Sequence, residues 1–243
     1  MGKDDDEVMF INYAHRGASQ YFPENTLSAF YAGLEMGANG IETDIHRTKD
    51  GVLVLFHDDE IGRATDGTGQ VSDYTYKELM EFNVFNPSKD RIDKIVTLED
   101  FLKYFGFRNL TFAIELKQDQ VEKDTIDMLE AFGMREKTIL TSFHYENVKN
   151  AKEYDSRYRV GLLYNVDEPD PVGKMQAIHG EELCPIARSL TREMVEHFHE
   201  MGFNVRAWGV YTEELMGYAY ACGADGMTIN FPDRLTAYLQ KEK

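Results

Sequence analysis

The chain has 243 residues, of which 42% are hydrophobic, so it is long enough for one large domain and too apolar to be intrinsically disordered. It carries 43 Asp and Glu against 26 Lys and Arg, a formal net charge of −17, and such a surface repels nucleic acids and anionic bilayers. No stretch approaches the roughly 18–20 apolar residues of a membrane span. We therefore expect no nucleic-acid partner and no stable membrane anchoring.

The N-terminus and the cysteines bear on the compartment. The opening MGKDDDE is acidic and lacks the apolar run of a signal peptide. Cys184 and Cys222 cannot build a disulfide framework, and both lie in apolar runs typical of small core side chains. These features predict a cytoplasmic protein. The sequence carries no signal for an oligomeric state.

Eight short runs rich in apolar and β-branched residues recur along the chain and predict strands. They are Val8–Ala14, Gly40–Ile45, Thr111–Leu116, Thr138–Phe143, Val160–Tyr164, Leu183–Ala187, Asn204–Val210 and Asp225–Ile229. Between them apolar residues recur at helical spacing, as at Leu27, Phe30 and Leu34. Glycines expected to end helices are Gly37, Gly133, Gly202 and Gly223, and threonines expected to begin them are Thr191 and Thr212.

Eight strand–helix units in a chain of this length predict a (β/α)8 TIM barrel that spans residues 1–243 as a single domain. The alternative is a doubly wound open sheet. The barrel is favoured because the units continue to the C-terminus without a change in composition, and no glycine-rich dinucleotide turn follows the first strand.

One unit of the predicted barrel is irregular. The second strand is followed by an alternating run, Gly51–His57, and then by a long polar stretch before the helix expected near Thr97–Phe105. Long connections inside a compact domain are usually functional. We interpret residues 58–96 as a small inserted subdomain next to the mouth of the barrel.

The active site of such a barrel forms at the C-terminal ends of its strands. Polar residues at the expected strand ends are His15 and Arg16, then Glu42, Asp44 and His46, then His57 and Asp58, and finally Glu115 and Lys117. Side chains alternate along a strand, so Glu42 and Asp44 share one face. Each residue alone also has a structural interpretation, as a hydrogen-bonded histidine or as a charge paired at the barrel rim.

Three carboxylates converging in a largely apolar barrel resist ionisation unless a cation is shared among them. Glu42, Asp44 and Glu115 are therefore candidate ligands of a hard divalent ion such as Mg²⁺ or Ca²⁺, which prefers oxygen ligands. Zn²⁺ is disfavoured because no Cys/His ligand spacing is present. The alternative is that these carboxylates pair with Lys117 or with a neighbouring arginine.

Taken together, these residues resemble the glycerophosphodiester phosphodiesterase family. The matching segments are His15-Arg16-Gly17, Pro23-Glu24-Asn25-Thr26, Glu42-x-Asp44, Lys49-Asp50-Gly51, His57-Asp58, Thr65–Gly69, Ala113–Lys117 and Phe231-Pro232-Asp233. The resemblance covers most of the chain, and the ordered combination is far more specific than any single segment.

The resemblance implies a barrel hydrolase that cleaves glycerophosphodiesters to glycerol 3-phosphate and an alcohol, using one bound Mg²⁺ or Ca²⁺, with Mn²⁺ as a further alternative. By motif position it assigns His15 and His57 as the general acid/base pair, Glu42, Asp44 and Glu115 as metal ligands, and Arg16 and Lys117 as phosphate-binding residues. Trp208, the only tryptophan, is expected to form an apolar wall for the substrate. The family usually shows Trp-Thr-Val-Asn where this chain has Trp208-Gly209-Val210-Tyr211, so its contacts to the alcohol or the glycerol differ there.

Two alternatives to this function remain. One is hydrolysis of a lysophospholipid, as by a lysophospholipase D, or of another phosphodiester. The other is a non-catalytic protein that binds glycerophosphodiesters, which the intact set of histidines and carboxylates disfavours. The sequence leaves open which histidine is the acid, and whether the nucleophile is water or the adjacent hydroxyl of the substrate.

Overall fold

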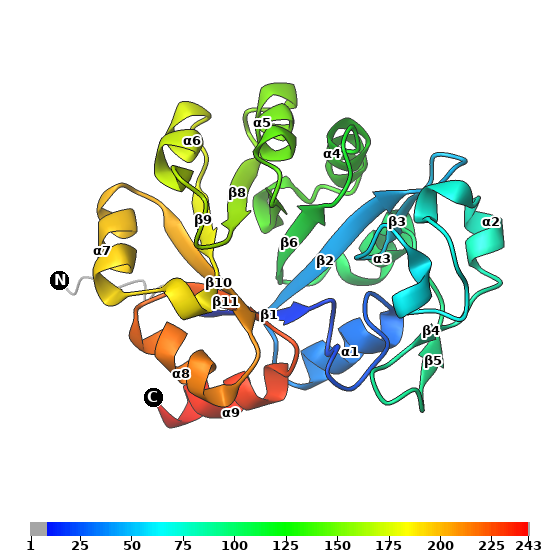
Figure 1. Ribbon diagram of the computed structural model, residues 1–243, viewed down its shortest axis with the longest axis horizontal. Coiled ribbons are helices and arrows are strands. Elements are labelled where there is room, and N and C mark those ends of the chain that lie inside the picture. Colours follow the sequence, from blue (N-terminus) through cyan, green and yellow to red (C-terminus); the bar gives the residue numbers. More distant parts are fainter. Residues whose placement is uncertain (1–8, 243) are drawn as a thin grey trace.

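The computed structural model describes residues 9–242, and its central feature is a closed barrel of eight parallel strands. The strands are β1 (Ile11–His15), β2 (Gly40–Arg47), β6 (Thr111–Leu116), β7 (Thr138–Ser142), β8 (Arg159–Tyr164), β9 (Glu182–Pro185), β10 (Asn204–Val210) and β11 (Gly226–Ile229). Each pairs with the next in chain order, and β1 pairs with both β2 and β11 (Figure 1). The predicted (β/α)8 barrel is confirmed, because an open sheet would leave two strands unpaired on one side. Val8, the predicted start of the first strand, lies outside the described residues, as does the acidic opening segment.

In the described part of the chain, eight helices of seven to ten residues alternate with these strands and surround the barrel (Figure 1). They are α1 (Leu27–Glu35), α3 (Leu98–Phe105), α4 (Glu122–Ala131), α5 (Tyr145–Tyr154), α6 (Pro171–Ala177), α7 (Arg192–Glu200), α8 (Glu213–Ala221) and α9 (Pro232–Lys241). The predicted helix starts are confirmed, since the hydroxyl oxygens of Thr191 and Thr212 accept hydrogen bonds from the first turns of α7 and α8. Across residues 9–242, no helix has the length and apolar character that crossing a bilayer requires.

The irregular unit contains short elements packed on an apolar cluster of their own. After β3 (Leu53–Leu55), which is antiparallel to β2, the chain forms the 3₁₀ turns η1 (Ile61–Arg63) and η2 (Val71–Asp73), the helix α2 (Tyr76–Leu79) and the hairpin β4 (Val84–Phe85)–β5 (Ile92–Asp93). The buried cluster consists of Val54, Phe56, Ile61, Ala64, Val71, Leu79, Val84 and Ile95. Figure 1 shows these elements together at one side of the barrel. On this packing we propose that residues 58–96 form an insertion within a single barrel domain.

The main apolar core lies between the strands and the surrounding helices, whereas part of the barrel interior is polar. Arg206 on β10 is 1% exposed, and its Nε donates to Glu182 Oε2 on β9 at 3.1 Å. Its Nη1 donates to Thr228 Oγ1 at 2.8 Å, and its guanidinium carbon lies 5.1 Å from the centre of the Tyr13 ring. A buried ion pair therefore occupies space that aliphatic side chains fill in most barrels of this type.

This ion pair gives a testable expectation for stability. We expect Glu182→Gln to lower the free energy of unfolding by about 3 kcal/mol, because it leaves the buried Arg206 charge uncompensated. Urea denaturation measures this. The matched control is Glu213→Gln, which breaks the Glu213–Arg234 pair of the same 3.1 Å length at an exposed site, where the loss is at most about 1 kcal/mol. Equal losses in the two variants would contradict the expectation.

Candidate active site

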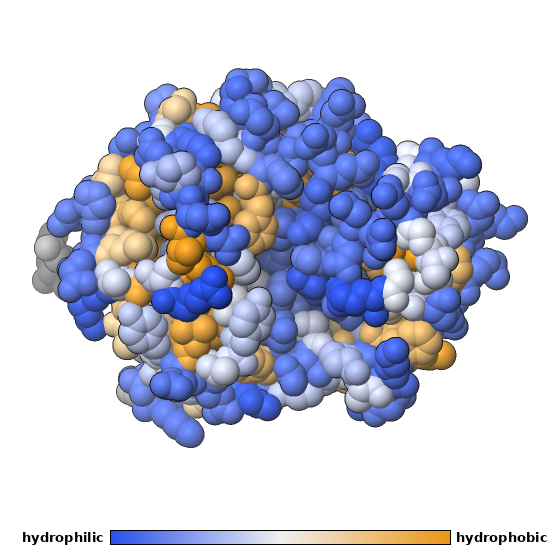
Figure 2. All heavy atoms as spheres, viewed as in Figure 1, coloured by the Kyte–Doolittle hydropathy of each residue, from blue (hydrophilic) through white to orange (hydrophobic). Residues whose placement is uncertain are grey.

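A cavity of about 380 Å³ opens at the C-terminal ends of the barrel strands. Seven of the eight predicted site residues line it: His15, Arg16, Glu42, His57, Glu115, Lys117 and Trp208. The eighth, Asp44, is fully buried next to them. Figure 2 shows a hollow at the centre of this face, hydrophilic within and bordered on its left by apolar side chains. The fold thus brings the predicted site residues together from four barrel strands and from the segment after β3.

Three acidic side chains meet in this cavity. Glu42 and Asp44 are two residues apart on β2 and share a face, and Asp44 is in register with Glu115 on β6. All three are buried, with exposures of 3%, 0% and 6%. One ligand atom from each can be chosen so that all lie within 4.8 Å of one another. The predicted convergence of the carboxylates is present in the structure.

The electrostatics of this cluster fit a bound cation. Burial raises the pKa of Glu42 well above its usual range, and the charges of Asp44 and Glu115 raise it further. Burial likewise raises the pKa of Glu115. Burial opposes ionisation of Asp44 too, but the Arg16 guanidinium, with Nε 3.2 Å from Asp44 Oδ2, acts together with other nearby charges and the hydrogen bond from Asn25 to lower the pKa of Asp44. Among the described residues Asp44 Oδ1 has no hydrogen-bond partner, so it is a buried anionic oxygen free to bind a metal ion.

His15 lies at the end of β1 on one side of the carboxylates. Its Nδ1 donates to Asn230 Oδ1 at 2.5 Å, and its Nε2 lies 3.8 Å from Glu42 Oε2. Burial and the nearby Arg16 charge lower the pKa of His15 to about 3, so the ring is neutral near pH 7. Nε2 is therefore the nitrogen available to exchange a proton in the cavity.

His57 lies on the other side, after β3. Its Nδ1 donates to Asp58 Oδ1 at 2.5 Å, and its Nε2 is 3.2 Å from Lys117 Nζ. Lys117 Nζ also donates to Glu115 Oε1 at 2.8 Å, so this lysine connects the histidine to the acidic cluster. His46 is buried, and its Nε2 is 3.2 Å from the His57 carbonyl oxygen, a structural hydrogen bond that helps to place the chain at His57.

The loop after β1 is held close to the acidic cluster. Arg16 and Gly17 both have left-handed backbones, with φ of +54° and +83°. A Cβ on Gly17 would lie 2.4 Å from the Ala29 carbonyl carbon, so only glycine lets the loop pack on α1 here. Asn25, also left-handed, donates from Nδ2 to Asp44 Oδ2 at 2.9 Å. Left-handed non-glycine residues are uncommon and cluster at functional sites.

The opposite wall of the cavity is apolar and aromatic. Trp208 Nε1 donates to the Tyr164 carbonyl at 3.1 Å, and the Phe143 ring meets the Trp208 ring edge-on, with centroids 4.8 Å apart. After Trp208 the register between β10 and β11 shifts, and Gly209 takes a φ of +70°, so the strand bulges. Tyr211 then lies 66% exposed at the mouth. The segment that departs from the family pattern therefore contains a bulge and an exposed tyrosine at the mouth of the cavity.

Several residues at the site were not predicted from the sequence as site residues. They are Asn25, Phe143, Arg206, Tyr211 and Asn230. Asn25 had a signal as part of a matching motif without an assigned role, and Tyr211 had one as part of the segment that departs from the family pattern. The others are recognisable only once the strands have brought them to the cavity.

The strand ends of this (β/α)8 barrel present three buried carboxylates, two histidines and the cationic side chains of Arg16 and Lys117. This combination is typical of a barrel enzyme that acts on a phosphate ester. The sequence profile of the Glycerophosphoryl diester phosphodiesterase family matches residues 15–234. A glycerophosphodiester phosphodiesterase from Caldanaerobacter subterraneus subsp. tengcongensis is 30% identical over 235 residues, which cover 94% of this chain and 97% of that protein. The chain belongs to this family and is an enzyme of the phosphoric diester hydrolase class.

Solved structures agree on the fold. A glycerophosphodiester phosphodiesterase from Agrobacterium tumefaciens superimposes with a TM-score of 0.81 at 24% identity, covering 94% of this chain and 99% of that one. A phosphodiesterase from Oleispira antarctica, solved in complex with the product sn-glycerol-3-phosphate, gives 0.83 at 22% identity, covering 94% and 96%. At these identities the structures support the barrel fold.

Proposed function

We propose that the protein hydrolyses glycerophosphodiesters to glycerol 3-phosphate and an alcohol with the help of one divalent cation. The observation that carries the proposal is the buried carboxylate cluster, with ligand atoms within 4.8 Å of one another, between two histidines in one cavity. Family membership supports the reaction class, and the bound product in the Oleispira antarctica structure supports the identity of the phosphate-containing product.

Glu42, Asp44 and Glu115 would hold the cation. We propose Mg²⁺ or Ca²⁺, with Mn²⁺ as the alternative, because the cluster offers only oxygen ligands. When bound, such an ion polarises a phosphoryl oxygen and acidifies an oxygen nucleophile. The carboxylates in turn would be kept ionised by the cation, which offsets the repulsion that raises the pKa of Glu42 and of Glu115.

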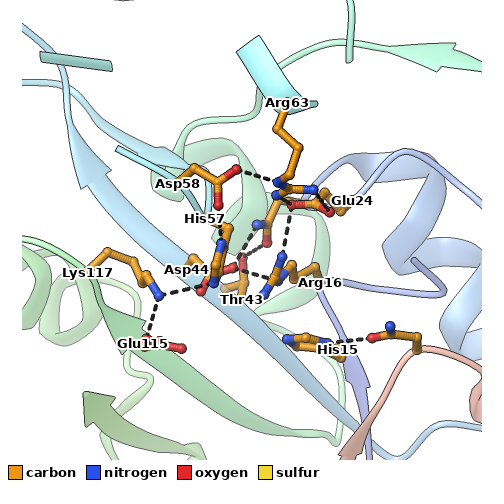
Figure 3. A network of polar contacts seen from close by, with 12 residues as sticks. His15, Arg16, Glu24, Thr43, Asp44, His57, Asp58, Arg63, Glu115 and Lys117 are labelled. Atoms are coloured by element: carbon orange, nitrogen blue, oxygen red, sulfur yellow. Dashed lines mark hydrogen bonds and ion pairs between the residues drawn. The ribbon is translucent and has the colours of Figure 1, made fainter. Parts of the chain in front are cut away.

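Arg16 and Lys117 would bind the phosphate from two directions. Figure 3 shows their nitrogens on either side of Asp44, one from the loop after β1 and one from the end of β6. Both side chains are largely buried, with exposures of 14% and 16%, so their charges act at short range in a medium that screens them weakly. They would also draw an anionic substrate to a protein whose net charge is −17.

His15 and His57 would carry the proton transfers. Both rings donate from Nδ1, to Asn230 and to Asp58, so each presents Nε2 for proton exchange. One ring would take the proton of the attacking oxygen, and the other would give a proton to the leaving alkoxide. This division suits either water or the adjacent hydroxyl of the substrate as the nucleophile.

Trp208 would contact the part of the substrate away from the phosphate. The side chains predicted for catalysis, metal binding and phosphate binding come from β1, β2, β6 and the segment after β3, whereas Trp208 and Phe143 form an apolar part of the cavity lining. A substrate with its phosphate at the acidic cluster would place its alcohol or its glycerol against that apolar lining. Figure 2 shows apolar side chains that extend outward from the left border of the hollow, so a lysophospholipid is the second candidate substrate.

The test uses glycerophosphocholine and lysophosphatidylcholine as parallel substrates, with products identified by phosphorus NMR. We expect the diester signal of glycerophosphocholine to be replaced by the monoester signal of glycerol 3-phosphate. Lysophosphatidate released faster from the lipid would favour the second candidate. Binding of glycerophosphocholine without turnover in the presence of each of the three metals would contradict the proposed function.

The partner and the compartment are proposals as well. We propose a small-molecule substrate and no nucleic-acid partner, which the net charge of −17 supports. We propose the cytoplasm as the location, because Cys184 and Cys222 are both free and buried and thus compatible with a reducing environment.

A further inference from the structure

We propose that Arg63, in the inserted segment, is a positioning residue that orients His57 and Arg16 at the same time. Arg63 ends the 3₁₀ turn η1, does not line the cavity, and has a side chain that is 50% exposed. Its guanidinium nevertheless connects to both sides of the phosphate-binding region through two acidic residues (Figure 3). The inference rests on the proposed function, because it concerns residues to which that function gives roles.

The first connection leads to His57. Arg63 Nε donates to Asp58 Oδ2, and the other oxygen of the same carboxylate accepts the hydrogen bond from His57 Nδ1 at 2.5 Å. Asp58 is thus held at both oxygens and cannot turn without losing one partner. The hydrogen bond from His57 Nδ1 to Asp58 sets the rotation of the imidazole, which places Nε2 at 3.2 Å from Lys117 Nζ. Residues that hydrogen-bond to a functional histidine from outside the cavity commonly fix its orientation.

The second connection leads to Arg16. The two terminal nitrogens of Arg63 donate to the two oxygens of Glu24, at 3.0 Å and 2.5 Å. Glu24 Oε1 also accepts from Arg16 Nη1 at 3.0 Å, and Arg16 Nε lies 3.2 Å from Asp44 Oδ2. Burial alone would raise the pKa of Glu24, but the hydrogen bonds from Arg63 and the charge of Arg16 lower it overall. Glu24 therefore stays ionised between the two arginines.

The chemistry of the side chain explains why one residue can make both connections. A guanidinium carries five N–H donors in a rigid plane, and here three of its nitrogens serve two carboxylates. A lysine has a single nitrogen and cannot reproduce this fork. Because half of the Arg63 side chain is exposed, its ion pairs add little to folding stability. A substitution should consequently affect turnover much more than unfolding.

The principal test is Arg63→Met, assayed with glycerophosphocholine. We expect kcat/KM to fall by about 10- to 100-fold, because small displacements of reacting groups cause losses of this size. The melting temperature should be nearly unchanged. Arg63→Lys should recover only part of the loss. The matched control is Arg157→Met, because Arg157 is 56% exposed and likewise pairs with two carboxylates, Asp155 and Glu130, away from the cavity. It should leave both kcat and KM unchanged.

The two connections can be separated with Asp58→Asn and Glu24→Gln. If Arg63 acts through Asp58 on His57, then Arg63→Met should lower kcat in the wild-type background but not further in Asp58→Asn. If it acts through Glu24 on Arg16, Arg63→Met should raise KM in the wild type but not further in Glu24→Gln. Losses that are the same in all three backgrounds, or wild-type kinetics of Arg63→Met, would overturn the proposal.

An NMR measurement that does not depend on substrate hydrolysis tests the role of Arg63 separately from the proposed function. In ¹⁵N-histidine-labelled protein, the hydrogen-bonded Nδ1 proton of His57 should give a slowly exchanging NMR signal, assigned by its absence in His57→Ala. We expect its exchange to be at least about 10-fold faster in Arg63→Met and unchanged in Arg157→Met. No difference between these variants would refute the role of Arg63, whereas absence of glycerol 3-phosphate formation by the wild type would refute only the proposed function.

Discussion

Replacing either His15 or His57 with alanine is expected to lower kcat on glycerophosphocholine by about 10²- to 10⁴-fold, the usual contribution of a positioned acid or base. Each ring presents Nε2 to the cavity while its Nδ1 is bound to Asn230 or to Asp58. The two side chains are 23% and 28% exposed and border the cavity, so truncation enlarges an existing cavity and leaves no closed void in the apolar core. The free energy of unfolding should therefore change by less than about 1.5 kcal/mol, which urea titration of the purified variants would measure.

His199→Ala is the matched control for these variants. His199 Nε2 lies 2.9 Å from Asp225 Oδ2, so it too is a partly exposed histidine paired with a carboxylate, but it lies on α7 outside the cavity lining. Its loss should leave kcat unchanged. Near-normal turnover in His15→Ala or in His57→Ala would remove that histidine from the proposed mechanism, and unfolding of either variant would show that its role is structural.

The barrel could be predicted from the sequence because its signals are local. A strand such as β6, Thr111–Leu116, contains the apolar run Phe112–Ile114, and Thr97 and Thr191 each lie directly before a helix that they cap. The interior of the insertion could not be predicted in this way. Its strands β4 and β5 have two residues each, and they are placed by contacts such as the bridge between Thr65 and Val84.

In the candidate site, too, residues with local sequence signals could be predicted, and residues placed by tertiary contacts could not. Glu42 and Asp44 could be placed together because strand alternation puts residues two apart on one face, and a strand-end motif suggested that Glu115 joins them. Asn230 could not be predicted as the partner of His15, because 215 residues separate them and only closure of the barrel between β1 and β11 brings them together. The same holds for Arg63, whose position depends on the fold of the insertion.

Removal of divalent metal by EDTA is expected to abolish hydrolysis, and Mg²⁺, Ca²⁺ or Mn²⁺ is expected to restore it. Without a cation, burial and mutual repulsion raise the pKa of Glu42 and of Glu115. A raised pKa means that the fold disfavours the ionised acid, so the metal-free protein should lose stability as the pH rises above the ordinary glutamate value. A bound cation should reverse this. At a metal concentration 100 times the Kd, binding alone adds about 2.7 kcal/mol to the free energy of unfolding, which a thermal-shift assay would detect at pH 7.

The assignment of the metal to this cluster is tested by comparing Glu42→Gln with Glu213→Gln, both assayed after EDTA treatment and with added metal. Glutamine keeps the size of the side chain but removes the charge that a hard cation requires. Glu42→Gln should lose both the activity and the thermal shift on addition of metal, whereas Glu213→Gln, at an exposed position on α8, should keep both. Full activity of the wild type in metal-free buffer would contradict the metal requirement. An undiminished thermal shift in Glu42→Gln would place the ion elsewhere. The raised pKa of Glu42 would then mean that this carboxyl group is protonated in the active protein.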